Sequence, residues 1–446
     1  MKFDLTPYKH LFRDYTELRA QENRRNVITL LNGDVLTNCV EINAGVSARV
    51  YARGKWGCAS QPDMSAESVE RVARQAGENA DFLADSAAQN ARELPRAAGI
   101  DAHDFSAEQP ELSQKDLIDF LRVLDGYLAK QSPRLLSRVL TLHAQTSEKQ
   151  VVTSDGAVVS AVMPRALLEI RFAVGKKGSV AEIANVYGGF GHFCDHFASF
   201  EPLYEECDRQ FAHLLRKVEG VYPQAGVMEC VLDADVVGLL AHEASLAAGG
   251  HALNSAIASP LVTLTDFAQS AFGKPCPAPV FVDDEGTPAR DVVLIERGVL
   301  AGALRDKVSA AREQAQPTGN ALAAQFSDAP AICARNAVIS PGAQTLAEMI
   351  ASIDDGYYLM SAERAQAALP GEFACGVTMG YEIKHGKLVK AIRGATISGR
   401  PLDALNTVSM VAKEMAWRRG GLGVNSLNTV GMGGAALTCR VAIGGR

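Results

Sequence analysis

The sequence predicts an α+β protein made of two domains, residues 1–220 and 221–446. Three observations support this prediction. Many segments alternate apolar and polar residues, as strands with one buried face do, and others repeat apolar residues every three or four positions, as helices do. The segment GVYPQAG, residues 220–226, interrupts both patterns with a proline between glycines. We expect an N-terminal α/β domain and a glycine-rich, β-dominated C-terminal domain, with antiparallel or mixed sheets and packed helices.

The N-terminal domain is expected to begin with an antiparallel meander over residues 24–60, whose first turn is Asn32-Gly33-Asp34. A helix should follow over 66–83 and a polar loop over 97–110. Ser113 and Asp116 form a capping box that predicts a second helix.

Strands should return from Leu136 onward. One of them is expected to direct Leu168, Ile170, Phe172 and Val174 to one face and Glu169 and Arg171 to the other. A third helix, over 204–218, completes the domain.

The C-terminal domain should start with a strand, VMECVLDA, and an apolar helix over 236–248. Arg297-Gly298 is typical of a hairpin turn. The last forty residues alternate glycine with Val, Leu and Thr, which favours strands with bulges. No phosphate-binding loop of the G-x-x-x-x-G-K-[ST] type occurs, so nucleotide binding is not expected.

Composition excludes several classes of function. The chain has 446 residues, of which 47% are hydrophobic and 21% charged, and its net charge of −7 argues against nucleic acid as a partner. No apolar run is long enough to span a bilayer, and the first residues lack a signal-peptide pattern, so we expect a cytoplasmic protein without membrane contact. The nine cysteines are scattered singly, which favours reduced thiols.

The segment AHEASLAAGGHAL, residues 241–253, begins like a zinc-peptidase helix. In such a helix two histidines one turn apart hold the metal, and the adjacent glutamate is the general base. Here His242 and Glu243 are present, but the positions four and five residues after His242 are Leu246 and Ala247. His251 follows a Gly-Gly pair and would have to fold back toward His242 to share a metal.

Two other clusters could carry chemistry. His192, Cys194 and His196 would share one face of an extended segment and could bind zinc; alternatively they belong to a loop that leads into a helix. The acidic segment Asp283-Asp284-Glu285 could bind a cation or act in acid–base chemistry. Because Gly-Thr-Pro follows it, these carboxylates more often build a turn through bonds to the backbone.

The order of several motifs resembles that of the TldD/PmbA family, also known as modulator of DNA gyrase, and is closer to its TldD branch. The motifs are LLAHEA (239–244), VDDEGTP (282–288), VLIERGVLAGALRDKVSA (293–310), PTGN (317–320), ARNAVISPG (334–342), YEIKHGKL (381–388), GATISG (394–399) and TCRVAIGG (438–445). Upstream, GVSARVYARGKWGCAS and TSDGAVVSAVMPRALLEIRFAV also fit, so the resemblance spans nearly the whole chain.

This resemblance implies a cytoplasmic, dimeric peptidase whose subunits enclose a chamber for unfolded or modified peptides. The motifs imply a chamber lined by Asp283, Asp284, Glu285, Asn320, Arg335 and Asn336. The family's zinc is held by an H-E-x-x-x-H helix and a cysteine in a glycine-rich segment near the C-terminus. His242 and Glu243 match the helix, but its second His falls on Ala247, and the cysteine falls near Gly420, Gly421, Leu422 and Gly423.

Two of three zinc ligands are therefore missing, and one imidazole cannot retain zinc. The resulting hypothesis is a subunit without its own metal that pairs with a metal-bearing TldD/TldE-type homologue, although a homodimer remains an alternative. A second hypothesis is an active metal-dependent peptidase or modifying enzyme. It would use His242 and Glu243 with a relocated metal held by His251, His192, Cys194, His196 or Cys375. A third is a binding protein for a modified peptide or a gyrase-related partner.

Overall fold

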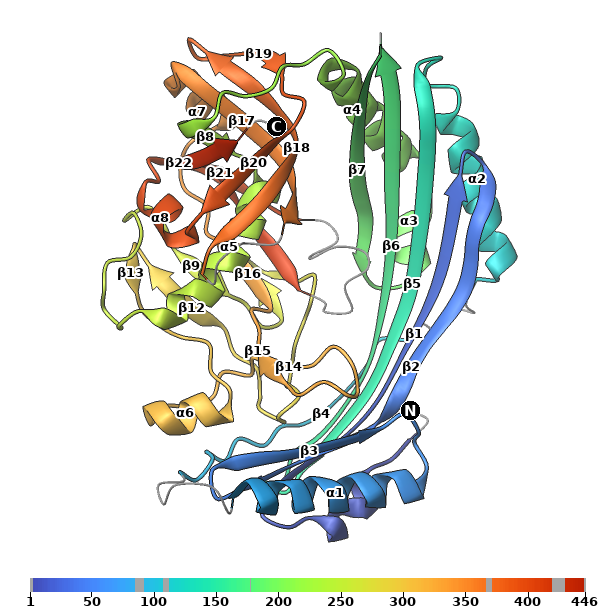
Figure 1. Ribbon diagram of the computed structural model, residues 1–446, viewed down its shortest axis with the longest axis vertical. Coiled ribbons are helices and arrows are strands. Elements are labelled where there is room, and N and C mark those ends of the chain that lie inside the picture. Colours follow the sequence, from blue (N-terminus) through green and yellow to red (C-terminus); the bar gives the residue numbers. More distant parts are fainter. Residues whose placement is uncertain are drawn as a thin grey trace.

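The computed structural model in Figure 1 describes residues 3–84, 92–106, 112–176, 178–365, 371–418 and 430–444. It confirms the α+β class: a seven-stranded sheet comes from the N-terminal half, and an eleven-stranded sheet and two small hairpins come from the C-terminal half. Within these residues, no helix combines the length and the apolar character needed to cross a bilayer.

The N-terminal sheet has the strand order β3-β2-β1-β5-β6-β4, with β7 also paired to β6. All pairings are antiparallel except that of β4 with β6. Its strands are β1 (Tyr15–Leu31), β2 (Asp34–Ala52), β3 (Lys55–Gln61), β4 (Ile100–Asp104), β5 (Leu135–Thr153), β6 (Val158–Lys176) and β7 (Ser179–Phe190).

The helices of this half pack on the N-terminal sheet or lie next to it. They are the 3₁₀ helix η1 (Thr6–Leu11), α1 (Ala66–Ala84), α2 (Gln114–Leu128), α3 (Phe193–Phe197) and α4 (Glu201–Lys217). Helix α1 packs on β2 and β3, α2 on β1 and β5, and α4 on β6 and β7. The predicted capping box at Ser113 is present at the start of α2.

The two faces of the N-terminal sheet have different neighbours. The apolar face of β6, with Leu168, Ile170, Phe172 and Val174, is buried in the core, as predicted. The opposite face, which we call the inner face, carries Gln21 of β1, Lys149 of β5 and Arg165 of β6 and is directed toward the C-terminal half. Figure 1 shows the long strands running beside that half, with α2 on the outer side.

The C-terminal sheet has the order β13-β12-β9-β16-β22-β20-β18-β17-β8, with β19 paired to β18 and β21 to β22. It is mixed, because β16 and β22, and β17 and β8, run parallel. Its strands are β8 (Gly226–Leu232), β9 (Leu264–Asp266), β12 (Val292–Glu296), β13 (Val299–Leu300), β16 (Asn336–Ile339), β17 (Asp355–Ala365), β18 (Phe373–Lys384), β19 (Lys387–Ala391), β20 (Ala395–Gly399), β21 (Met410–Trp417) and β22 (Gly431–Gly444).

The remaining C-terminal elements connect these strands. The small hairpins are β10 (Ser270–Ala271) with β11 (Lys274–Pro275) and β14 (Ala321–Leu322) with β15 (Ala331–Ile332). The helices are α5 (Ala234–Ala247), the 3₁₀ helix η2 (Ala248–Gly250), α6 (Lys307–Glu313), α7 (Leu346–Ser352) and α8 (Pro401–Asn406).

Several local predictions are confirmed. Asn32 and Gly33 adopt positive φ angles of 53° and 93°, and Arg297 and Gly298 of 47° and 84°, as tight hairpin turns require. The glycine-rich C-terminus forms strand β22, and its pairing with β21 is irregular between Val411 and Met415, as the expected bulges imply.

One local prediction is wrong, and one remains a prediction. The segment expected as a polar loop over 97–110 contains strand β4, whose residues are mostly polar because it lies at the sheet edge; residues 107–110 are outside the described part. The division into domains 1–220 and 221–446 stays a prediction, because the sheets divide there but one apolar core runs through both halves.

Candidate functional site

Helix α5, which carries His242 and Glu243, is buried against the C-terminal sheet. Asp233 caps its N-terminus by accepting a bond from the Ala234 N–H. A Cβ on Gly238 would lie 3.0 Å from the Met432 backbone, so glycine permits the close approach of the helix to β22. His242 is only 3% exposed, whereas Glu243 is half-buried.

The residues after His242 offer no second donor at the required spacing. Ala247 ends α5 and is packed against the core, and its methyl group cannot bind a metal. The Ser245 hydroxyl donates to the Ala241 carbonyl oxygen at 2.8 Å, within the helix itself. His251 follows η2 and is exposed, unlike buried His242. The residues present therefore do not fit the zinc that the family motif implies.

The third ligand position, residues 420–423, lies outside the described residues. Among the described residues, no group of three or more His, Cys, Asp or Glu side chains is placed to hold a metal ion. Cys375, another candidate for a relocated site, is buried in β18.

The expectation that His192, Cys194 and His196 share one face of an extended segment is wrong. This segment forms the helical turn α3, and the alternative of a loop leading into a helix is confirmed. Nε2 of His192 lies 2.9 Å from the Phe105 carbonyl oxygen and Nε2 of His196 lies 2.9 Å from that of Phe190, while Cys194 is exposed. Both imidazoles are thus committed to different backbone groups.

Asp283 builds a turn, as its sequence context favours. Its carboxylate accepts from the backbone N–H groups of Glu285, Thr287 and Ala321, at 3.0, 2.8 and 3.0 Å. Burial, with a smaller contribution from the charge of Glu285, raises the pKa of Asp283 well above its ordinary value.

The two neighbouring carboxylates join the halves of the molecule. Asp284 accepts two bonds from Lys149 Nζ on β5, at 2.7 and 2.9 Å. Burial opposes the ionisation of Asp284, but the charges of Lys149 and Arg19 outweigh it and lower the pKa. Glu285 accepts from Arg49 Nη2 at 3.0 Å. All three acidic residues are therefore occupied by protein partners.

Asn320, Arg335 and Asn336 are fully buried around Asp266. Arg335 Nε donates to Asp266 at 2.9 Å, and Asn320 Nδ2 does so at 2.8 Å. Asn336 uses its amide to bind the backbone carbonyls of Phe267 and Ala278. These side chains order loops inside the C-terminal half, and their part in lining a chamber stays a prediction.

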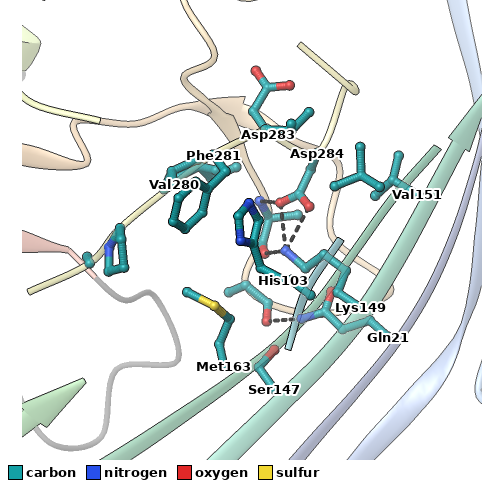
Figure 2. Close-up of a pocket in the computed structure, with 18 of the residues that line it drawn as sticks. Gln21, His103, Ser147, Lys149, Val151, Met163, Val280, Phe281, Asp283 and Asp284 are labelled. Carbon is teal, nitrogen blue, oxygen red and sulfur yellow. Dashed lines mark hydrogen bonds and ion pairs between the residues drawn. The ribbon is translucent and has the colours of Figure 1, made fainter. Parts of the chain in front are cut away.

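A cavity of about 190 Å³ separates the inner face from the loop that contains Asp283 and Asp284. Figure 2 shows Val280 and Phe281 on one side and Met163, Ser147 and Lys149 on the sheet side. His103 of β4 stacks on Phe281, with ring centroids 3.6 Å apart. The cavity thus has an apolar wall at Val280 and Phe281 and a floor on the sheet that mixes polar and apolar side chains. Of the predicted chamber residues only Asp283 and Asp284 line it.

Sequence reasoning missed the floor of this cavity. Its residues come from three strands that are distant in sequence, and they include Gln21, Lys149 and Arg165. One signal was available: β5 carries His143, Gln145, Ser147 and Lys149 at alternate positions, so one of its faces is polar although the strand lies in the middle of the sheet.

Two family models match the chain. The PmbA/TldA metallopeptidase C-terminal domain matches residues 225–437, and the PmbA/TldA metallopeptidase domain 1 matches residues 16–80. The chain is 25% identical over 320 residues to a zinc metalloprotease TldD homolog of Saccharolobus solfataricus, covering 69% of this chain and 71% of that protein. It is 24% identical over 438 residues to a metalloprotease TldD homolog of Haemophilus influenzae, covering 92% and 87%.

The fold has also been seen before. The crystal structure of TldE from Thermococcus kodakarensis matches with a TM-score of 0.74 and 19% sequence identity, covering 99% of this chain and 98% of that one. The family models, the TldD homologues and this shared fold agree with the ordered motifs of the sequence. The chain is a metallopeptidase-like protein that belongs to the TldD/PmbA family.

Proposed function

We propose that this chain is a metal-free subunit of a cytoplasmic peptide-processing complex, paired with a metal-bearing TldD/TldE-type homologue. One observation carries the proposal: helix α5 keeps His242 and Glu243 but has a methyl group, Ala247, where the family motif has its second histidine. A catalytic zinc needs three protein donors, and the sequence at 420–423 has no thiol to supply the third.

Support for a partner comes from the match to TldE over nearly the full length of both chains. In this proposal the chain has the body of a family subunit but lacks the donors of a zinc site. Its role in this proposal is to complete the walls of a chamber that holds an unfolded or modified peptide. An extended peptide can be held there through main-chain bonds, which do not depend on its side chains.

The proposal is tested by purifying the chain alone and together with an H-E-x-x-x-H homologue from the same organism, with zinc supplied in both cases. Alone, we expect much less than one zinc per chain and no cleavage of an unfolded peptide such as reduced, alkylated α-lactalbumin. Together, we expect a stable complex that cleaves it. Replacing the motif glutamate of the homologue by glutamine should abolish this activity.

The second hypothesis, an active enzyme with a relocated metal, gives the opposite result in the same experiment. It requires the isolated chain to bind stoichiometric metal and to lose it in the His242→Ala variant. Stoichiometric zinc together with peptide cleavage by the chain alone would overturn the metal-free proposal. Equal metal content in wild type and His242→Ala would exclude His242 as a ligand.

A further inference from the structure

Arg165 is on the inner face of the N-terminal sheet. On β6 it lies directly opposite Gln145 of β5 and Phe190 of β7, and Gln145 in turn lies opposite Arg25 of β1. Directly opposed residues on neighbouring strands point to the same side of a sheet. Arg25, Gln145 and Arg165 therefore form a row across three strands, and Phe190 continues it with an apolar ring.

Arg165 is a buried cation without a partner among the described residues. Arg165 is only 9% exposed, and its Nε has no hydrogen-bond acceptor in the described part of the chain. Burial lowers the pKa of Arg165 to about 10, so it is still charged at neutral pH. The other buried lysines and arginines of the described part all bind carboxylates or carbonyl oxygens: Arg19, Arg49, Lys217, Lys307 and Arg335.

Two other inner-face residues, His143 and Arg25, carry buried nitrogens without a partner in the described part of the chain, although neither lines the cavity. His143 lies two residues along β5 from Gln145, and neither of its buried ring nitrogens has a partner in the described part of the chain. Burial, followed by the charge of Arg25, lowers the pKa of His143 to about 4, so the ring is neutral at pH 7 and can still donate one N–H. Arg25 bonds to Glu41 through Nε at 3.0 Å, which leaves its Nη1 without an acceptor.

Arg165 can be reached by a ligand from the cavity on the inner face. Its side chain is on the inner face, where Arg165 lines the 190 Å³ cavity together with Gln145 and Pro164. Met163, Phe190 and Phe281 form an apolar wall of this cavity. One water molecule needs roughly 10–15 Å³ in such a cavity, so this one has room for a ligand the size of an amino-acid residue.

We propose that Arg165 anchors a carboxylate-binding site in this cavity, which takes a ligand with one carboxylate next to an apolar side chain. The guanidinium would bind the carboxylate in bidentate fashion, and the negative charge of the ligand would neutralise the Arg165 cation. Met163, Phe190 and Phe281 would cover the apolar side chain. The C-terminal residue of a peptide and a small carboxylic acid share this chemistry. The site goes beyond the proposed function, because it depends neither on zinc nor on a partner subunit.

The test is isothermal titration calorimetry of the full-length protein with four probes. The tetrapeptide acetyl-Gly-Gly-Ala-Phe and its C-terminal amide differ only in the carboxylate, 3-phenylpropionate represents a small acid, and inorganic phosphate represents other anions. We expect the peptide acid to bind at least tenfold more tightly than the amide, and phosphate to bind more weakly than both acids. If the peptide acid binds more tightly than 3-phenylpropionate, the ligand is the C-terminus of a peptide. If 3-phenylpropionate binds at least as tightly as the peptide acid, the ligand is a small carboxylic acid.

Variants connect the binding to Arg165. Arg165→Met should reduce the affinity for the peptide acid to that for the amide, and Arg165→Lys should keep part of the preference. Arg171→Met is the matched control, because Arg171 is on the same face of β6 but is paired with Glu169 and Glu182. Its variant should bind as wild type does. Equal binding of acid and amide, an acid preference that survives in Arg165→Met, or phosphate binding as tight as the acids would overturn the proposal.

Discussion

Buried cations are paired in one part of the inner face, and in another part a buried cation has no partner in the described part of the chain. Near the acidic segment several buried cations are paired with carboxylates: Lys149 with Asp284, Arg49 with Glu17 and Glu285, and Lys307 with Asp155. Four residues farther along β5, at Gln145, the facing cation Arg165 has no partner among the described residues.

This difference distinguishes buried charges that stabilise the fold from those that indicate a ligand site. A buried ion that has an oppositely charged partner is compensated. Removing one member of such a pair leaves the other as an uncompensated charge in the low-dielectric interior. A buried ion with no partner costs stability in the free protein, since nothing replaces its lost hydration. The first kind is explained by packing alone, whereas the second calls for a binding partner.

The largest change in stability is expected near the acidic segment, where the buried charges are paired. Lys307 is fully buried and donates to Asp155 at 2.7 Å and to Tyr15 at 2.6 Å, so it joins α6 to the N-terminal sheet. Lys307→Met leaves Asp155 uncompensated and should lower the free energy of unfolding by about 3–5 kcal/mol. Urea denaturation followed by circular dichroism measures this change. A loss below about 1 kcal/mol would mean that the pairing does not hold the two halves together.

Glu285 in the acidic segment and His143 near Arg165 should affect the pH dependence of stability differently. Burial, and next the charge of Glu17, raises the pKa of Glu285 from 4.5 to about 7, so the folded state binds the proton more tightly than the unfolded state. This contribution to stability is complete below about pH 4.5 and is lost as the pH rises to about 7, a change of roughly 3 kcal/mol.

His143 acts in the opposite direction. Its pKa falls from 6.5 to about 4, so its contribution is complete above pH 6.5 and is lost as the pH decreases toward 4. Chemical denaturation at several pH values would separate the two groups. Glu285→Gln should make stability rise more steeply between pH 4.5 and 7, and His143→Gln should make it rise less steeply. Unchanged slopes in both variants would contradict these assignments.

Mutation of Arg165 should change the free energy of unfolding in the opposite direction from mutation of Lys307. Arg165→Met removes an uncompensated buried charge and keeps most of the side-chain volume, so we expect the free energy of unfolding to rise by about 1–2 kcal/mol. Arg171→Met, which breaks partly exposed pairs, should change it by less than about 1 kcal/mol. Thermal and urea denaturation of both variants provide the comparison. A clear loss of stability in Arg165→Met would show that this cation supports the fold.

The smallest effect is expected at the surface, where water compensates charges whether or not they are paired. Arg71 and Glu67 form an ion pair between residues i and i+4 of α1, with side chains 48% and 80% exposed. Arg71→Ala should cost about 0.3–0.5 kcal/mol, and less at high salt. A double-mutant cycle with Glu67→Ala measures the pair, and a coupling above about 1 kcal/mol would weaken the contrast between surface and interior.

Much of the local structure followed from the sequence. Periodicity predicted α1, α2, α4 and α5 and parts of the long N-terminal strands, because burying one face of an element imposes a pattern that can be seen without the rest of the chain. Turns such as Asn32-Gly33 were equally local, since they depend only on positive φ angles. The absence of the second histidine at Ala247 is also a property of spacing within one helix.

Only the tertiary structure decided which residues meet. Arg165, Gln145 and Arg25 are far apart along the chain, and nothing in their local sequence shows that three strands align them beside the loop of residues 278–284. The same holds for Asp283, Asp284 and Glu285, which could have been ligands until Lys149, Arg49 and several backbone N–H groups were found to occupy them. Local pattern determines which face of an element is buried; the partner of each buried charge depends on register and packing between distant segments, so a cation such as Arg165 can be recognised as unpaired only in the folded chain.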